Sequence, residues 1–404
     1  MRKCILFILS SLVLTISGCS SPSSNYHKVT KFSDHVYLVD TYKEFDYDFV
    51  QDYCYKENYN WQTPASSGGG CSIVMKELED GTLLAGRNMD LNISHNCAYI
   101  VRSDVGGIRT FGLQYTFRDM SPTLADIQKN GGISDEWYKL LPFMCDDIIN
   151  ERGLYVEVNM RNGEYYPTGE DKFACSGTNP LSSTTIYMFT LARYIAQNCS
   201  RVSEVEAYVN SLNIYSKEHY WNYAFMVADK TGDYGLIEMA CNKVYFHHYQ
   251  NCQTNFYVEP TLNTMELVPA GIGRYQYLRS HVDEVETSKD MYELMKQVSY
   301  SQVYWPYLCP FDVRSENIGA VPYAVYQFMM DDEYKEFIYE QLDESAKKTR
   351  NLSRDDKRNL NSIWESTFTE VVDVTNGTIS VRFYEDDNNL AFIDRNRERV
   401  LNAF

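Results

Sequence analysis

A cysteine directly follows the clearest linker in the chain. Residues 64–70 read Pro-Ala-Ser-Ser-Gly-Gly-Gly, a loop composition, and the next residue is Cys71. If the chain is cut between Gly70 and Cys71, this cysteine gains an α-amine beside its thiol. The amine titrates at about 8 and the thiol at about 8.5, so proton exchange between them costs little at neutral pH. This pattern indicates acyl chemistry with the thiol as nucleophile and the amine as base.

The residues after Cys71 have the pattern of a β-hairpin. Two strand-like runs, 71–79 and 82–90, flank Asp80-Gly81, which favours a two-residue type I′ turn. In that register paired residue numbers sum to 161, and Cys71 lies opposite Asp90. Their Cβ atoms would then be about 4.5–5.5 Å apart. Asp90 would hold the Cys71 amine by a charge-assisted hydrogen bond.

Arg87 stands on the second strand of this hairpin. An arginine near Cys71 would lower the pKa of the thiol or position an acyl oxygen. In an unbroken hairpin, however, Arg87 faces Val74, on the opposite side from Cys71. Both side chains serve one site only if a bulge or a strand end lies between Arg87 and Asp90.

These residues resemble the start of the choloylglycine hydrolase family. The resemblance rests on Cys71-Ser72-Ile73-Val74, Asp80-Gly81 and Gly86-Arg87-Asn88-Met89-Asp90, with 16 residues from Cys71 to Arg87 and 19 to Asp90. The family includes bile salt hydrolases, penicillin V acylases, N-acylethanolamine acid amidase and acid ceramidase. The resemblance implies an α+β fold, the αββα sandwich of N-terminal-nucleophile (Ntn) hydrolases, with Cys71, Arg87 and Asp90 in the site.

The resemblance extends over most of the stretch 71–384. Residues 147–154 resemble the family's Asn-Glu-Lys-Gly-Leu segment, which leads to a strand ending at Asn159. There a backbone N–H would help form an oxyanion hole, although Asn159 could be a plain strand-end residue. Residues 253–257 resemble the family's Thr-Asn segment, which makes Asn255 the second oxyanion donor or else a turn residue. Gly273-Arg274-Tyr275 resembles a later arginine that steadies the site; covering a helix start is the alternative.

The chain departs from bile salt hydrolases before the nucleophile. There the nucleophile follows the initiator Met, whereas here 51 residues, 20–70, separate Cys19 from Cys71. The amidase and ceramidase relatives carry a comparable N-terminal segment. Self-cleavage cuts it from the rest of the chain, but it stays bound as a subunit. We therefore expect cleavage between Gly70 and Cys71, with residues 31–70 as a propeptide or small subunit that stays bound. Three consecutive glycines would allow the strained turn that this cleavage needs.

The first residues have the pattern of a lipoprotein signal peptide. Met1-Arg2-Lys3 is basic, and residues 4–18 are apolar but too short to span a bilayer comfortably. Ile16-Ser17-Gly18-Cys19 resembles the lipobox of bacterial lipoproteins. The expected organisation is a signal peptide (1–18), a tether lipidated at Cys19 (19–30), the N-terminal segment (31–70) and the catalytic domain (71–404). This pattern predicts export and lipid anchoring at the bacterial cell envelope. The alternative is an ordinary cleaved signal peptide or a short N-terminal membrane anchor.

The composition of the chain limits which binding partners are possible. The chain has 404 residues, 44% hydrophobic and 23% charged, and a net charge of −18. Such a charge disfavours nucleic acid, and it leaves the lipid as the only means of membrane attachment. His247-His248 has no third ligand at a recognised spacing, so we expect neither metal nor other cofactor. Eight cysteines remain besides those at positions 4, 19 and 71, and they could form disulfides or stay as buried free thiols. A homo-oligomer is also possible.

Mixed strand and helix patterns without strict alternation indicate an α+β fold. The predicted strands are 36–40, 98–102, 110–115, 154–159, 223–228, 235–239 and 243–248, with a closing hairpin of 368–374 and 378–384. The predicted helices are 42–55, 135–149, 183–197, 205–212 and 331–347, and others after Gly273 and Ser288. Ser203 and Glu206 have the spacing of a capping box for the fourth of these.

Together these patterns predict a hydrolase that cleaves linear amide carbon–nitrogen bonds of an acylated small molecule through a thioester. Bile-salt, N-acyl amide and penicillin V side-chain substrates all occur in the family that the chain resembles, and the sequence does not choose among them. Two alternatives stay open. One is an acyltransferase of the isopenicillin N type, in which an amine replaces water, and the other is a non-catalytic lipoprotein that binds acylated ligands.

Overall fold

The computed structural model describes twelve stretches of the chain. They are residues 27–32, 36–41, 44–56, 70–92, 98–115, 139–162, 175–216, 221–263, 271–299, 364–383, 389–394 and 399–402. The predicted signal peptide, Cys19 and the helix expected at 331–347 lie outside the described residues. Within the described stretches, no helix has the length and apolarity needed to cross a membrane.

The larger sheet has nine strands in the order β1-β2-β5-β6-β7-β8-β11-β12-β13. All neighbouring pairs are antiparallel except β2 with β5. Its strands are β1 (His27–Lys31), β2 (Val36–Thr41), β5 (Ala98–Val105), β6 (Ile108–Tyr115), β7 (Asp147–Asn150), β8 (Leu154–Asn162), β11 (Trp221–Asp229), β12 (Tyr234–Ala240) and β13 (Lys243–His248).

The second sheet has seven strands in the order β14-β3-β4-β15-β16-β17-β18 and carries Cys71. Its strands are β3 (Gly70–Glu77), β4 (Leu83–Asn92), β14 (Cys252–Gln253), β15 (Trp364–Asp373), β16 (Thr378–Phe383), β17 (Asn389–Asp394) and β18 (Arg399–Asn402). A separate parallel pair joins β9 (Thr185–Tyr187) to β10 (Asn213–Tyr215).

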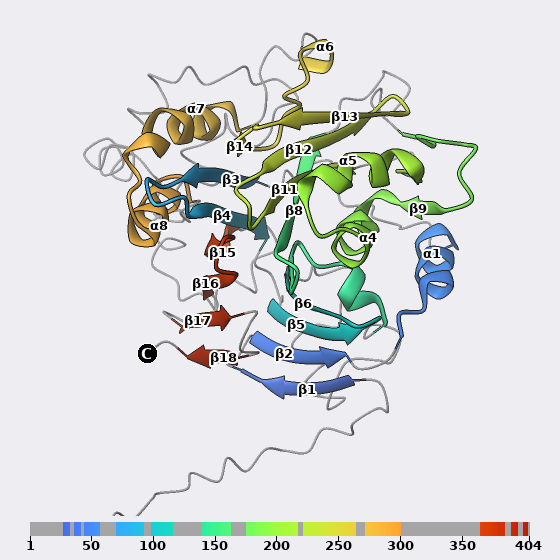
Figure 1. Ribbon diagram of the computed structural model, residues 1–404, viewed down its shortest axis with the longest axis horizontal. Helices are drawn as coiled ribbons and strands as arrows, with labels where there is room; N and C mark the ends of the chain where they lie inside the picture. Colours follow the sequence, from blue (N-terminus) through green and yellow to red (C-terminus); the bar gives the residue numbers. More distant parts are fainter. Residues whose placement is uncertain are drawn as a thin grey trace, which may run out of the picture.

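The two sheets pack face to face, with helices outside both (Figure 1). The larger sheet is covered by α4 (Leu191–Asn198), α5 (Val202–Ser211) and α1 (Tyr47–Lys56), and the second by α7 (Ile272–His281) and α8 (Ser288–Gln297). One apolar core lies between the sheets and one lies under each helical layer. Short helices η1 (Leu141–Phe143), η2 (Met188–Thr190), η3 (Val282–Glu284) and α6 (Pro260–Asn263) connect the elements. The predicted αββα sandwich of the α+β class is confirmed.

The N-terminal segment contributes to this sandwich. β1 and β2 form one edge of the larger sheet, and β2 runs parallel to β5 over six residue pairs. Val36, Val39, Val50 and Cys54 of this segment are fully buried. β1 begins at His27, so the last residues of the predicted tether are a strand rather than a flexible linker.

Three helix predictions were wrong in part. Residues 147–149, expected at the end of a helix, belong to strand β7, because the run Asp-Ile-Ile-Asn pairs with both β6 and β8. The helix expected from Ser183 begins only at Leu191, after β9 and η2. α5 begins at Val202, so Ser203 lies inside it and caps nothing.

The other pattern predictions agree with the structure more closely, although the helix expected at 42–55 begins only at Tyr47. The meander β11-β12-β13, the strands β2, β5, β6 and β8, and the hairpin of β15 and β16 are present. α7 and α8 lie where helices were expected after Gly273 and Ser288. Among the described cysteines, Cys71, Cys145, Cys175, Cys199 and Cys252 are buried free thiols.

Candidate active site

The β3–β4 hairpin differs from the predicted register by one residue. Its loop has three residues, because Leu78 N donates to Thr82 O at 2.9 Å and Gly81 adopts a left-handed conformation with φ of 84°. Such loops combine a type I turn with a left-handed glycine. Paired numbers therefore sum to 160, and Cys71 lies opposite Met89 while Asp90 lies opposite Gly70. The predicted pairing of Cys71 with Asp90 was wrong.

This one-residue shift exchanges the faces of the sheet. Cys71 and Arg87 now share the inner face, which packs against the larger sheet, without any bulge between Arg87 and Asp90. Asp90 points to the outer face, toward the helices. A register irregularity does occur beside Asp90, but it lies in the neighbouring strand β15, between Ser366 and Phe368. Ser366 Oγ from this irregular stretch donates to Asp90 Oδ1 at 2.5 Å.

The Cys71 side chain is almost fully enclosed, with 2% of its surface exposed. Its Sγ lies 3.5 Å from Met89 Sδ. Burial raises the pKa of the thiol to about 12 and outweighs the positive charge of Arg87, which lowers it. The Asp90 and Glu157 carboxylates raise it further. In the continuous chain the thiol is therefore protonated at neutral pH.

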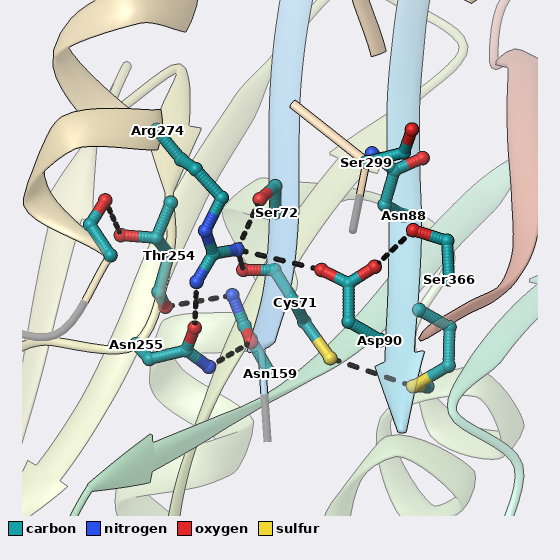
Figure 2. A network of polar contacts seen from close by, with 12 residues as sticks. Cys71, Ser72, Asn88, Asp90, Asn159, Thr254, Asn255, Arg274, Ser299 and Ser366 are labelled. Carbon is teal, nitrogen blue, oxygen red and sulfur yellow. Dashed lines mark hydrogen bonds and ion pairs between the residues drawn. The ribbon is translucent and has the colours of Figure 1, made fainter. Parts of the chain in front are cut away.

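Arg274 organises the outer side of the site (Figure 2). Its Nη1 donates to the carbonyl oxygen of Cys71 at 2.9 Å and to Ser72 Oγ at 2.6 Å. Its Nη2 donates to Asn255 Oδ1 at 2.8 Å, and Nη1 lies 3.6 Å from Asp90 Oδ2. The side chain is 2% exposed. One guanidinium from α7 thus joins the nucleophile strand, the aspartate and the predicted oxyanion donor.

Two asparagines continue this network toward the larger sheet. Because a guanidinium only donates, Asn255 must turn Oδ1 to Arg274 and Nδ2 away from it. Asn255 Nδ2 donates to Asn159 Oδ1 at 3.4 Å, and Asn159 Nδ2 donates to Thr254 O at 2.8 Å. β14 pairs with β3 through Gln253 and Ile73, which brings the following Thr254 and Asn255 beside the start of β3. The Asn159 side chain therefore fixes the segment that carries Asn255.

Arg87 is held on the inner face by acceptors from the larger sheet. Its Nε donates to Glu157 Oε1 at 2.9 Å, its Nη1 to Asp147 Oδ2, and its Nη2 to Val158 O at 2.9 Å. Burial alone would lower the pKa of Arg87, but Glu157 and the other nearby acids raise it overall. The guanidinium therefore stays charged. Its positive charge lowers the pKa of the Cys71 thiol. Met89 lies between the two side chains, with its Sδ 3.9 Å from Arg87 Nη2 and 3.5 Å from Cys71 Sγ.

The structure thus brings the six predicted site residues to the two faces of one strand pair and its neighbours. Sequence reasoning missed Ser72, Met89 and Thr254 as members of the network. Ser72 and Met89 stand inside the motifs, and a three-residue loop would have placed Met89 against Cys71. Asp147, Tyr155, Glu157 and Glu370 were also missed. They surround Arg87 from β7, β8 and β15 with no local sequence signal.

The site contains side chains that are suited to acyl transfer. Among the described residues, no group of three His, Cys, Asp or Glu side chains has the arrangement of a metal site. Nε2 of His247, which the sequence did not favour as a metal ligand, lies 3.1 Å from Glu238 Oε2. A thiol, an amide group and two buried arginines are the kinds of group that a nucleophilic acyl transfer would use.

Residues 71–261 match the family of linear amide C–N hydrolases, choloylglycine hydrolase family. The resemblance carried by the motifs is thereby confirmed, and the matched segment belongs to this family. The enzyme class is accordingly a hydrolase acting on carbon–nitrogen bonds other than peptide bonds.

Solved structures of similar fold include conjugated bile acid hydrolase from Clostridium perfringens and penicillin V acylase from Agrobacterium tumefaciens. Two variants of the former are each 15% identical with a TM-score of 0.42, covering 81% and 83% of this chain and 93% and 97% of theirs. The acylase is 13% identical with a TM-score of 0.39, covering 81% of this chain and 87% of its own. A search of curated proteins gave no match.

Proposed function

We propose that the chain is a cysteine Ntn hydrolase in which Cys71 attacks the amide carbonyl of an acylated small molecule. The observation that carries this proposal is the Arg274 network. One guanidinium holds the main chain of Cys71, the side chain of Asn255 and the vicinity of Asp90. A nucleophile, an oxyanion donor and a carboxylate for the amine are thereby fixed relative to one another.

Cleavage between Gly70 and Cys71 would activate the thiol. In the continuous chain the Cys71 nitrogen is an amide, and burial raises the pKa of the thiol to about 12. After cleavage the same nitrogen is an amine that can take the thiol proton. Asp90 lies opposite Gly70 across the hairpin, one residue from that amine. This position suits a carboxylate that holds the new ammonium group.

The catalytic steps follow from this arrangement. The Cys71 sulfur adds to the carbonyl carbon, and the Asn255 Nδ2 group together with a backbone N–H near Asn159 stabilises the oxyanion. The Cys71 ammonium protonates the departing nitrogen as the carbon–nitrogen bond breaks, which leaves a thioester. A water molecule then gives a proton to the amine, attacks the thioester and releases the acid with the regenerated thiol.

The N-terminal segment would remain bound after cleavage. β2 is paired along its whole length with β5, and Val36, Val39 and Val50 are buried in the sandwich. Releasing it would expose this apolar surface and the edge of β5 to water. We further propose that the chain is exported and lipid-anchored through Cys19, as its N-terminal motif indicates.

Intact mass spectrometry of the chain from residue 20, beside Cys71→Ala, tests the self-cleavage. We expect two co-purifying chains that meet at Gly70–Cys71 in the wild type and one whole chain in the variant. If the wild type stays uncut at mildly acidic and neutral pH, self-processing is wrong.

Hydrolysis is tested on a panel of bile-salt, acyl-ethanolamide and penicillin V substrates. Release of the acid that is lost in Cys71→Ser supports the hydrolase. Transfer of the acyl group to an added amine in preference to water would instead show the acyltransferase. Binding without turnover by the cleaved protein would leave the non-catalytic lipoprotein.

A further inference from the structure

Four acidic or phenolic side chains surround Arg87 between the sheets. We call these four residues and Arg87 the inner cluster: Asp147, Tyr155, Glu157, Glu370 and Arg87. All five are at most 1% exposed. Arg87 donates to Asp147 and Glu157 but makes no direct hydrogen bond to Glu370 among the bonds of the described residues. Three ionised carboxylates around one guanidinium would leave two uncompensated charges in a dry interior, which is strongly unfavourable.

A count of protons at Tyr155 shows where the excess charge is removed. Tyr155 Oη lies 2.9 Å from Asp147 Oδ1 and 2.8 Å from Glu370 Oε1. A phenol has one proton, so it donates to only one of these oxygens, and the other carboxyl group must carry a proton of its own to make its bond. Two ionised carboxylates at these distances would leave one oxygen facing the lone pairs of the phenol.

Glu370 is the group that holds this extra proton. Asp147 places its second oxygen against Arg87 and is therefore stabilised as a carboxylate. In Glu370, by contrast, Oε2 is buried and has no hydrogen-bond partner among the described residues. A neutral Glu370 donates to Tyr155 Oη, which in turn donates to Asp147, which accepts from Arg87. Every proton in this chain then has an acceptor.

We propose that Glu370 is a positioning residue that stores a proton and, through Tyr155 and Asp147, sets the charge around Arg87 behind the Cys71 thiol. This inference deepens the proposed function, and it rests on that function only in taking Cys71 as the nucleophile. When Glu370 loses its proton to solvent, the cluster gains a negative charge. The field at Cys71 becomes less positive, so the thiolate is disfavoured and the thiol reacts more slowly than it otherwise would.

The surroundings of Glu370 place this titration near neutral pH. Burial raises the pKa of Glu370 to about 7, although Arg87 and the Tyr155 hydroxyl lower it. The charged and titratable groups that act on it directly are Arg87 from β4 and Tyr155 from β8. Asp147 from β7 is bonded to Tyr155, and Glu157 from β8 is bonded to Arg87. Helix α8 packs on the opposite face of β15, where Val371 meets Met291 and Met295.

The test measures protonation and reactivity separately in the full chain. Infrared difference spectra between pH 6 and pH 8 should show the carbonyl band of a buried carboxylic acid in the wild type and in Glu79→Gln, an exposed control, but not in Glu370→Gln. The rate of Cys71 alkylation by iodoacetamide, read by mass at Cys71, should rise less steeply above pH 7 in the wild type than in Glu370→Gln. The expected difference at pH 8 is roughly tenfold. Tyr155→Phe should change the same profile.

Each outcome decides one point. If the infrared band survives in Glu370→Gln, another group holds the proton and the proposal is wrong. If the band is lost but the alkylation profile of Glu370→Gln matches the wild type, Glu370 is merely structural and the positioning role is wrong. Neither readout requires turnover. A chain that hydrolyses none of the panel substrates but shows both effects would contradict the hydrolase while supporting the role of Glu370.

Discussion

The two buried arginines beside Cys71 are held by different kinds of partner. On the inner face, Arg87 donates to two carboxylates and one carbonyl oxygen, and a third carboxyl group lies close behind. On the outer face, Arg274 donates to a carbonyl, a hydroxyl and an amide oxygen, and its Nη1 lies 3.6 Å from the carboxylate of Asp90. Both guanidinium groups act on the same cysteine from opposite sides of one strand.

This difference separates two tasks. Arg274 uses the fixed fork of its guanidinium to hold several neutral acceptors in one geometry. Arg87 instead neutralises acids that the larger sheet places between the two sheets, so its charge matters more than its shape. We therefore expect changes on the inner face to affect stability and pH dependence first, and changes on the outer face to affect the rate first.

Arg87→Leu should have the largest effect. The variant leaves Asp147 and Glu157 buried without a cation, and such a loss costs about 3–5 kcal/mol of unfolding free energy. Chemical denaturation measures it. Arg102→Leu is the matched control, because its pair with Asp40 is partly exposed and should contribute about 1 kcal/mol or less. Equal losses in the two variants would contradict the charge-balancing role of Arg87.

Asn255→Ala should reduce kcat on the best panel substrate by about 10²–10³, the usual cost of one missing oxyanion donor. Asn255→Asp is the matched variant, because it keeps an oxygen for Arg274 and replaces the Nδ2 donor by a second, charged oxygen. Both variants should lose activity to a similar extent while their unfolding midpoints stay close to that of the wild type. An Asp variant with nearly full activity would exclude Asn255 as a donor.

Stability should depend on pH through Glu370. The pKa of this group is about 7 in the folded chain and 4.5 in its ordinary state. The protonated group therefore contributes its full stabilisation to the free energy of unfolding below pH 4.5. This contribution decreases by at most about 3 kcal/mol as the pH rises to 7, and it does not change further above that pH. Denaturation of Glu370→Gln and wild type at pH 5 and pH 8 measures it. The variant should gain stability relative to the wild type as the pH rises, and a constant difference would contradict the prediction.

Arg274→Lys should cost less stability than Arg87→Leu, about 1–2 kcal/mol, since the positive charge near Asp90 is kept. A lysine cannot hold Cys71 O, Ser72 Oγ and Asn255 Oδ1 together, so kcat should still fall about ten- to a hundredfold. Parallel denaturation and rate measurements separate the two effects. A loss of stability as large as that of Arg87→Leu would remove the distinction between the two faces.

Local patterns predicted much of the fold and the residue types of the site. The strands of the meander, the closing hairpin and helices α7 and α8 follow from periodicity and turn residues, and the motif spacing pointed to Cys71, Arg87 and Asp90. The hairpin register did not follow, because Asp80-Gly81 fits both a two-residue turn and the end of a three-residue loop. Residues 147–149 were also misjudged, since the pairing of their strand with β6 and β8 overrides local helix propensity.

By itself, the sequence determined which reactive residue types stand at fixed intervals along this chain. A cysteine after a glycine linker, followed at fixed intervals by an arginine and an aspartate, predicts a thiol nucleophile with charged neighbours. The tertiary structure alone decided how those charges are balanced. Asp147, Glu157 and Glu370 are 60, 70 and 283 residues from Arg87 along the chain and meet it only because two sheets pack face to face. Burial of that cluster, which no local pattern encodes, determines where its protons reside.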